Sequence, residues 1–459
     1  MGEAKTRKGI WQNEYFIWAS RDPHFGSFNT LQSERSRQMA KILKLKNSPT
    51  SEPMCLTCHA LAPAEQSKAR PFAVEGVSCE NCHGPSSGWF QKHFEEKGTT
   101  AQSIQNGMKP IDDLVERSEI CLSCHLGTKP GQEVDHKMIA AGHPDLFFEV
   151  DLFSAKEPRH WAEPPDWTAP PKRTEPGPWG DSTHDRNYRV RLWAVGQAIQ
   201  LREALNRLAR RAERAQAPDF LAKGGQWPEF SELDCFSCHH SVRSNWPQPA
   251  YEDRTAGLPS KPSDSWRQKN GYDDRIAGAP PWNRAHYTIF LILMKEVDPN
   301  ESAELEARLD RLFKVASKLN SSPQEVKSKA DEAVELASRV VSKVNKPFDR
   351  PTLGRLLLKI SAQGKDIAQQ DTRSAEQAYM ALDSLFRCYD SKINNKSDVK
   401  NRVRTGEAAL NTGEFPGVGK AIDKLYNQFD NPSAYNAMVF ATGMAEVHAE
   451  LRKAGIGSR

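Results

Sequence analysis

The chain has 459 residues, 38% of them hydrophobic, which allows two to three domains with cores of ordinary size. Its 63 Lys and Arg residues nearly balance 59 Asp and Glu residues, and the formal charge of +4 gives no reason to expect a nucleic acid as partner. The longest apolar run, residues 287–294, is far shorter than the roughly 20 residues of a transmembrane helix, so we expect no membrane span in this sequence.

The N-terminal part of the chain predicts few regular elements between long irregular stretches. Apolar residues at helical spacing predict a helix over residues 31–45, with Pro49 beyond its end. Residues 156–182 are dense in Pro and Trp, which predicts an extended loop. A long amphipathic helix is predicted over residues 188–215, and a second Pro- and Gly-rich loop over residues 241–283.

Four copies of one short pattern dominate this part of the chain. Each copy has two cysteines three positions apart and a histidine directly after them. The copies are Cys55-x-x-Cys58-His59, Cys79-x-x-Cys82-His83, Cys121-x-x-Cys124-His125 and Cys235-x-x-Cys238-His239. C-x-x-C-H is the attachment pattern of c-type haem. Two thiols about one helical turn apart reach the two vinyl groups of one porphyrin, and the histidine then binds the iron from the proximal side.

Paired cysteines also occur in structural zinc sites and in redox-active disulfides. Neither of these interpretations explains a histidine after every second cysteine. We therefore predict four covalently attached haem c groups, each with its iron. Eight of the nine cysteines belong to the motifs, and the ninth, Cys388, lies in an apolar helical segment where we expect a buried, inert thiol.

Each motif supplies one axial ligand, and nine other histidines compete for the opposite side of the irons. His136 and His143 are seven residues apart, either on one helix face or at the two ends of a bent segment, which suits ligands of two different haems. His93 follows the proximal His83 by ten residues and can reach a neighbouring haem. His24 lies in a Pro-marked turn ahead of the first helix. We predict His24, His93, His136 and His143 as distal ligands.

The remaining histidines are weaker candidates for the iron. His160 sits beside a tryptophan in the Pro-rich loop and can line a haem pocket. His240 directly follows a proximal histidine, so a hydrogen bond to a neighbouring ligand suits it better than iron binding. Met138 is an alternative sixth ligand, although an apolar role explains it equally well. For the other three we favour surface or core roles: His184, His286 and His448.

The chain after residue 285 has no further Cys–His motif and predicts amphipathic helices. Leucine and valine recur at helical spacing over residues 301–319. The sequence Ser322-Pro-Gln-Glu is a capping box with proline at the first helical position, and it opens a helix through Val344. Asn431-Pro similarly opens the last helix. Short turns between such helices are typical of an antiparallel bundle.

The sequence therefore predicts a mainly α protein with two domains. Residues 1–285 form a multihaem cytochrome c domain with little regular structure between the motifs. Residues 286–459 form an antiparallel helical bundle.

Four features together resemble the cytochrome c-554 family of multihaem cytochromes, relatives of hydroxylamine oxidoreductase and the octahaem reductases. They are the Gly-Val-Ser-Cys-Glu-Asn-Cys-His-Gly-Pro site at 76–85 with its downstream His93, and the Ala-Ala-Gly-His-Pro-Asp-Leu-Phe-Phe-Glu block at 140–149. The others are Ala-Val-Gly-Gln at 194–197, and Trp-Pro-Glu-Phe at 227–230 ahead of the fourth motif. The resemblance covers roughly residues 10–285, so the bundle inherits no function from it.

The resemblance implies closely packed haem pairs, mostly bis-histidine ligation and electron transfer between redox partner proteins outside the cytoplasm. All four motifs end in histidine, so the lysine that replaces this residue in some catalytic relatives is absent. Covalent haem attachment takes place outside the cytoplasm, yet no secretion signal follows Met1. We therefore expect a periplasmic or otherwise extracytoplasmic protein whose sequence is a mature or trimmed form.

We favour an electron carrier over a catalyst, because an iron with histidine on both sides has no position for a substrate. The alternative is a haem oxidoreductase that acts on a small nitrogen or sulfur compound, such as hydroxylamine, NO or nitrite, at a five-coordinate haem. A third hypothesis is a subunit that the C-terminal bundle docks into a larger assembly.

Overall fold

The computed structural model describes residues 14–61, 72–93, 100–158, 160, 188–234, 280–393, 410–429 and 435–457. These residues are mainly α, as predicted, and their only β-type pairing is an isolated antiparallel bridge between Leu233 and Trp282. Two compact units make up the chain. The first comprises Met1–Phe148 and Phe153–Arg186, and the second Glu149–Leu152 and Asn187–Arg459. The domain boundary at residue 285, which we drew from the motifs, stays a prediction.

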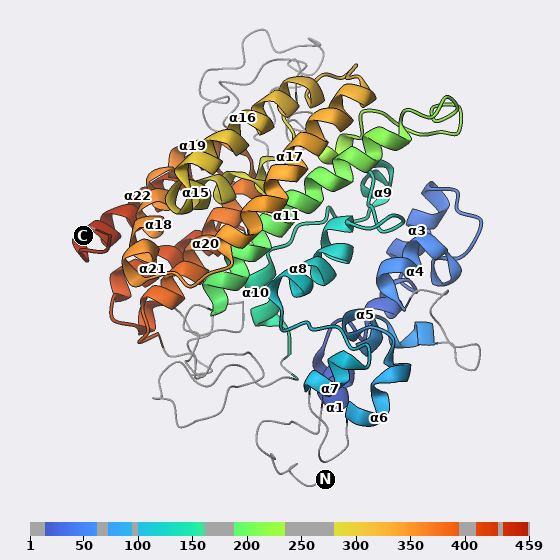
Figure 1. Cartoon of the computed structure of the whole chain (residues 1–459), viewed down its shortest axis with the longest axis horizontal. Coiled ribbons are helices and arrows are strands. Elements are labelled where there is room, and N and C mark those ends of the chain that lie inside the picture. Colours follow the sequence, from blue (N-terminus) through green and yellow to red (C-terminus); the bar gives the residue numbers. More distant parts are fainter. Residues whose placement is uncertain are drawn as a thin grey trace. The chain divides into compact units, whose positions relative to one another are not determined.

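The first unit consists of short helices and turns (Figure 1, blue to cyan). They are α1 (Glu14–Arg21), α2 (Ser27–Thr30), α3 (Glu34–Ile42), η1 (Pro49–Ser51), α4 (Pro53–His59), η3 (Phe72–Glu75), α5 (Cys79–His83), η4 (Ser86–Gly88), α6 (Phe90–His93), α7 (Thr100–Gln105), α8 (Leu114–Leu122), the π-helical turn η5 (Ser123–Gly127) and α9 (His136–Ala141). Helix α10 (Val150–Lys156) begins in a segment of the second unit. Helix α3 is shorter than predicted, because Ser33 caps it by accepting a hydrogen bond from Ser36 N.

The first unit contains a small apolar cluster of Phe28, Leu31, Leu56 and Ala60, with the motif residue Cys55 packed against it. Other described residues of the unit are buried as well, among them Trp18, Trp89, Leu122 and Leu126.

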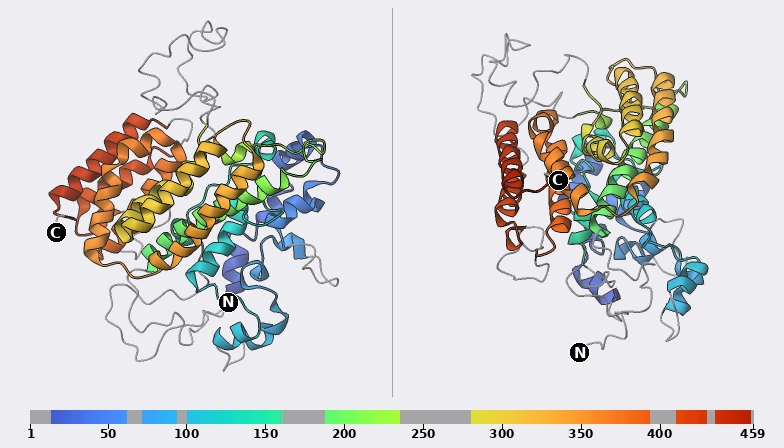
Figure 2. Two further views of the ribbon diagram at one scale, coloured as in Figure 1. Left: turned by 45° about the horizontal axis from the view of Figure 1, so that its top comes forward. Right: turned by 60° about the vertical axis from the view of Figure 1, so that its left-hand side comes forward.

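The second unit consists of longer helices that pack along one another (Figure 2). They are α11 (Tyr188–Arg214), η6 (Phe230–Glu232), η7 (Arg284–His286), α15 (Thr288–Val297), α16 (Pro299–Ala316), α17 (Pro323–Val344), α18 (Arg350–Ala362), α19 (Gly364–Gln370), α20 (Thr372–Tyr389), η9 (Leu410–Thr412), α21 (Pro416–Tyr426) and α22 (Ala437–Lys453). The longest apolar run of the sequence lies in α15 and is buried in this packing. Among the described helices, none is both long and apolar enough to cross a membrane.

Helices α16 and α17 run antiparallel, as their ion pairs demonstrate. The pairs are Lys343 with Asp298 at 3.1 Å, Arg339 with Glu301 at 3.2 Å, and Arg308 with Glu335 at 3.1 Å. The predicted N-cap of α17 is present, since Ser322 Oγ accepts a hydrogen bond from Glu325 N at 3.3 Å. The predicted start of the last helix was wrong. Helix α22 begins at Ala437, because Asn436 Oδ1 caps it by accepting hydrogen bonds from Met438 N and Val439 N.

Backbone hydrogen bonds join two parts of the second unit that are distant in sequence. Asp234 N donates to Pro281 O at 2.9 Å, and Asn283 N donates to Glu232 O at 2.9 Å. These bonds flank the bridge between Leu233 and Trp282. They hold the two ends of segment 235–279 together.

The carboxylate of Glu232 reinforces this junction. Arg207 Nε donates to Glu232 Oε1 at 2.7 Å, and Arg211 Nη1 lies 2.9 Å from the same oxygen. Trp282 Nε1 donates to the other oxygen at 3.3 Å. Burial acts to raise the pKa of Glu232, but the two guanidinium groups outweigh it and lower the pKa to about 2. The buried carboxyl group is therefore ionised in the folded protein at neutral pH.

Replacing Glu232 with Gln should reduce the free energy of unfolding by about 3–5 kcal/mol at neutral pH, because two buried guanidinium groups lose their counter-ion. Denaturant unfolding followed by the circular dichroism of the helices measures this. In the wild type, the contribution of Glu232 is complete above about pH 4.5 and is lost as the pH falls toward 2, and Glu232→Gln should lack that loss.

Glu335→Gln is the matched control, because Glu335 is 69% exposed in its pair with Arg308. Its cost should stay below about 1 kcal/mol. Equal costs for the two variants would contradict a buried ionic junction at Glu232.

Candidate functional site

Three of the four motifs lie within the described residues, each in or at the end of a short helix. The first occupies the last turns of α4, the second forms α5, and the third runs from the end of α8 into η5. Pro53 opens α4, and Asp113 caps α8 by accepting hydrogen bonds from the backbone. Residues three positions apart on a helix are neighbours on its surface, so each helical turn brings the two cysteines of a motif together.

Each of the three motif histidines faces a second histidine from a distant part of the sequence. The ring centres of His59 and His143 lie 6.5 Å apart, with their planes at 84°. The corresponding values are 6.3 Å and 70° for His83 with His160. They are 6.0 Å and 82° for His125 with His24.

This spacing fits two ligands of one iron. An imidazole nitrogen binds a metal ion at about 2.0 Å and lies about 1.1 Å from the centre of its own ring. Two imidazoles on opposite sides of one haem iron therefore have ring centres roughly 6 Å apart. The three pairs have this separation, so the residues present fit a haem iron with two histidine ligands at each of these motifs.

Hydrogen bonds at Nδ1 leave Nε2 available in three of these histidines. His59 Nδ1 lies 3.0 Å from Ser27 O, and His143 Nδ1 lies 2.7 Å from Pro144 O. His24 Nδ1 lies 2.9 Å from Asp22 Oδ1. Carbonyl and carboxylate oxygens only accept, so Nδ1 carries the proton in each ring. The unprotonated Nε2 is then the nitrogen that can bind a metal.

Burial favours the neutral form of three of these histidines. It lowers the pKa of His125 to about 4, and the nearby His24 adds to the effect. Burial also lowers the pKa of His143 and of His160. In contrast, the hydrogen bond to Asp22 raises the pKa of His24 against the effect of burial. Because iron binds neutral imidazole, the surroundings of His125, His143 and His160 would suit ligation.

The first and third motifs are neighbours. The side chains of Cys58 and Cys124 lie within hydrogen-bonding reach of each other. Gln132 Nε2 donates to Thr57 O at 3.1 Å and to Cys124 Sγ at 3.4 Å, so one side chain contacts both motifs. Burial raises the pKa of Cys121 to about 12, whereas the interaction with Cys58 lowers the pKa of Cys124 to about 7.

Among the described side chains, one group of three possible metal ligands comes together: Asp22, His24 and Glu157. It contains no cysteine. Structural zinc sites need four ligands, commonly with two or more thiolates.

Several predicted site residues are not among these pairs. The fourth motif, with Cys235, Cys238 and His239, falls outside the described residues, and so does the side chain of His93. His136 is half-buried at the first position of α9, and its role stays a prediction. Cys388 on α20 is partly exposed rather than fully buried as we expected.

From the sequence we ranked the partner of His83 too low. We gave His160 a minor place because it lies in a Pro- and Trp-rich loop, and such a loop has no period from which to infer where its side chains point. Phe148, which stacks on His125 with ring centres 4.3 Å apart and planes at 22°, was also not singled out. It belongs to the 140–149 block that carried the family resemblance.

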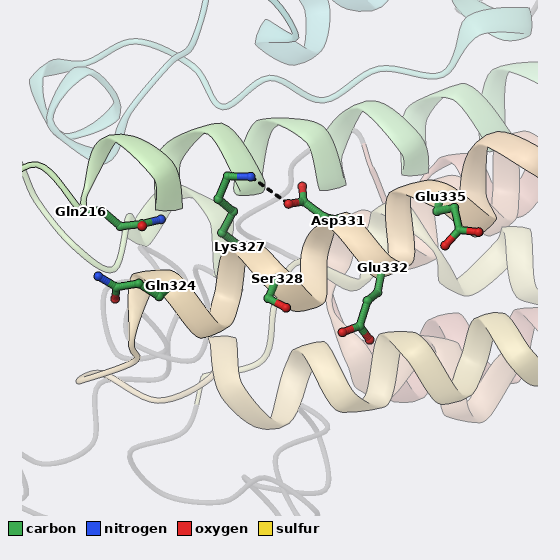
Figure 3. Close-up of a pocket in the computed structure, with 7 residues that line it drawn as sticks. All are labelled: Gln216, Gln324, Lys327, Ser328, Asp331, Glu332 and Glu335. Carbon is green, nitrogen blue, oxygen red and sulfur yellow. Dashed lines mark hydrogen bonds and ion pairs between the residues drawn. The ribbon is translucent and has the colours of Figure 1, made fainter.

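The second unit has an open depression where the end of α11 meets the start of α17. Figure 3 shows the polar residues that line it: Gln216, which follows the end of α11, and six residues of α17. Lys327 and Asp331 pair across one turn at 2.8 Å. Gln216, just after the end of α11, and Gln324, at the start of α17, both line this depression. Near the start of α11, Arg191 Nη2 donates to Asn345 Oδ1, just after the end of α17. Helices α11 and α17 therefore run antiparallel. The depression has the character of a solvated surface.

Residues 11–84 match the family model described as cytochrome c554 and c-prime. The matched segment contains the first two motifs and His24, and it supports the family resemblance found in the sequence. No curated protein and no solved structure matches the chain.

Ser27 holds the turn after α1 against the first two motifs. Its Oγ lies 2.7 Å from His24 O and 3.0 Å from His59 O, and it accepts a hydrogen bond from Val77 N at 3.0 Å. Its carbonyl oxygen accepts from His59 Nδ1. One small residue therefore connects the segments around His24, His59 and Val77.

Ser27→Ala should lower the free energy of unfolding by about 1–3 kcal/mol, because Val77 N loses its acceptor in a half-buried turn. Denaturant unfolding followed by haem absorption measures this. Ser20→Ala is the control: Ser20 is exposed and its hydroxyl donates to Phe16 O, so its effect should stay within about 0.5 kcal/mol. A Ser27→Ala protein as stable as the control would contradict the connecting role.

Proposed function

We propose that this chain is an extracytoplasmic tetrahaem c-type cytochrome that transfers electrons between redox partner proteins. The family match over residues 11–84 supports a c-type cytochrome with covalently bound haem that takes part in electron transfer. The count of four rests on the four C-x-x-C-H motifs of the sequence. A periplasmic location follows from where haem is attached to such motifs.

The observation that carries the proposal is the pairing of motif histidines with distant histidines at 6.0–6.5 Å between ring centres. We assign three ligand pairs: His59 with His143, His83 with His160, and His125 with His24. His93 and His136, which the sequence also predicts as distal ligands, are not assigned to a motif.

Bound haem c supplies one-electron chemistry at its iron. The residues of this chain would hold two imidazoles for each of three irons: His59 with His143, His83 with His160, and His125 with His24. An iron bound by both imidazoles would have no coordination position for a substrate. Their hydrogen bonds fix the ring orientations, so little rearrangement accompanies a change of charge. The adjacency of Cys58 and Cys124 supports close packing of the haems on the first and third motifs. Close packing favours rapid electron exchange between them.

Replacing His143 with Ala should leave one iron with five ligands. Mass spectrometry should find four added porphyrins in both the wild type and the variant, and EPR of the oxidised variant should show one high-spin haem more than the wild type. His448→Ala is the control, because His448 bonds to Ser361 in the second unit and should not change the haem signals. An unchanged spectrum for His143→Ala would contradict the assigned pair.

The same wild-type spectrum distinguishes the carrier from the alternative function. High-spin signals from the irons of the first three motifs would favour a haem oxidoreductase of small nitrogen or sulfur compounds. Low-spin signals from these irons support electron transfer.

The orientation of the paired rings gives a second prediction. The planes of His24 and His125 meet at 82°, and those of His59 and His143 at 84°. Perpendicular imidazoles interact with different iron d orbitals and make these nearly equal in energy, so the low-spin EPR signals should be strongly anisotropic with one large g value. Parallel planes give rhombic signals instead. Finding only rhombic signals would contradict these orientations.

A further inference from the structure

The hydrogen-bond acceptor at Nδ1 of His24 differs from the acceptors at Nδ1 of His59 and His143. His24 Nδ1 bonds to the carboxylate of Asp22 at 2.9 Å, whereas His59 and His143 bond to neutral backbone carbonyl groups. Only 2% of the Asp22 side chain is exposed. The same carboxylate oxygen accepts a hydrogen bond from His24 N at 2.9 Å, so it fixes both the backbone and the ring of His24.

Two carboxyl groups lie close to the ring of His24. Asp22 accepts hydrogen bonds from His24, and the carboxyl group of Glu157 lies within 4.8 Å of the ligand atoms of both residues. Arg117 is an opposing charge in these surroundings, and its Nε donates to Ile111 O. Asp22 is therefore the acidic group in direct contact with the proposed ligand.

We propose that Asp22 is a positioning residue that lowers the reduction potential of the haem held by His125 and His24, below those of the haems held by the other two described pairs. The proposal rests on the proposed function, because it assumes that His24 binds an iron. It assigns to this one haem a ligand with greater negative charge.

The physical reason is the charge that a carboxylate places behind the imidazole. A strong anionic acceptor pulls the Nδ1 proton, which makes Nε2 a stronger donor to the iron. A stronger donor stabilises the oxidised iron, with its higher charge, more than the reduced iron. A neutral carbonyl acceptor strengthens Nε2 as a donor less, so it stabilises the oxidised iron less. Low exposure preserves the effect, because little water screens the carboxylate.

Within a chain of carriers, the haem of lowest potential retains an electron least. An electron that arrives there passes readily to either neighbour of higher potential. The haem of the third motif would then be reduced only briefly and would pass each electron on.

Asp22→Asn tests the proposal, because asparagine keeps the shape and the hydrogen-bond acceptor but removes the charge. A redox titration of the whole protein, followed by haem absorption and EPR, should show one potential rising. We expect about a tenfold change in the reduction equilibrium, which is 59 mV for one electron. The affected haem should be the one that becomes high-spin in His24→Ala, and it should stay low-spin in Asp22→Asn.

Three further variants separate charge from structure. Asp22→Glu restores the charge and should return the potential toward the wild-type value. Asp113→Asn removes an exposed carboxylate that caps α8 without contacting a ligand, and it should shift no potential. Glu157→Gln should shift the same haem less than Asp22→Asn does, because its carboxyl group makes no hydrogen bond to His24 in the proposed arrangement.

Unchanged potentials in Asp22→Asn, a shift of a different haem, or an equal shift in Asp113→Asn would overturn the proposal. A larger effect of Glu157→Gln would also overturn it, because the field would then act without the hydrogen bond. These failures differ from failure of the proposed function, in which the wild type itself would lack a low-spin haem that depends on His24.

Discussion

Six histidines of the first unit come together in three pairs with ring centres 6.0–6.5 Å apart. Several turns and short helices of that unit hold these rings in position. Three of these rings belong to the histidines that end the motifs. The other three come from the turn at His24 and from His143 and His160, far along the chain. Ser27 and Asp22 hold two of the rings in orientation through Nδ1. The small apolar cluster around Phe28 could not by itself keep six polar rings aligned, so local hydrogen bonds share that role.

The second unit follows ordinary rules of helix packing, and there the sequence predicted most of the structure. The capping box at Ser322 and the helical period gave α17 its observed bounds, and the long helix before the fourth motif ends at Arg214, one residue from its predicted end. The predicted start of α22 was wrong because both Asn431 and Asn436 can cap a helix. Local sequence does not show which of the two does so. That α11 packs against α17, about 130 residues later, is a tertiary preference that amphipathic patterning does not encode.

The candidate site was predictable where its chemistry is local. Two cysteines and a histidine in five residues predict a haem attachment site on their own, and short flanking patterns predicted His24 and His143, which face His125 and His59. The proximity of His83 to His160 could not be derived, because nearly 80 residues of short helices and loops separate them. Which histidine faces which motif depends on how the intervening loops fold. Asp22, adjacent to a predicted ligand pattern, was visible in the sequence, but its hydrogen bond to Nδ1 was not.

The backbone pairing of Asp234 with Pro281 has a consequence for the stretch between them, which carries the fourth motif. Both residues belong to one compact unit, and their hydrogen bond joins points that are far apart in sequence. The entropic cost of closing a loop rises only slowly with its length. Insertions or deletions within residues 235–279 should therefore change the stability of that unit little, as long as the pairing of Asp234 with Pro281 is kept.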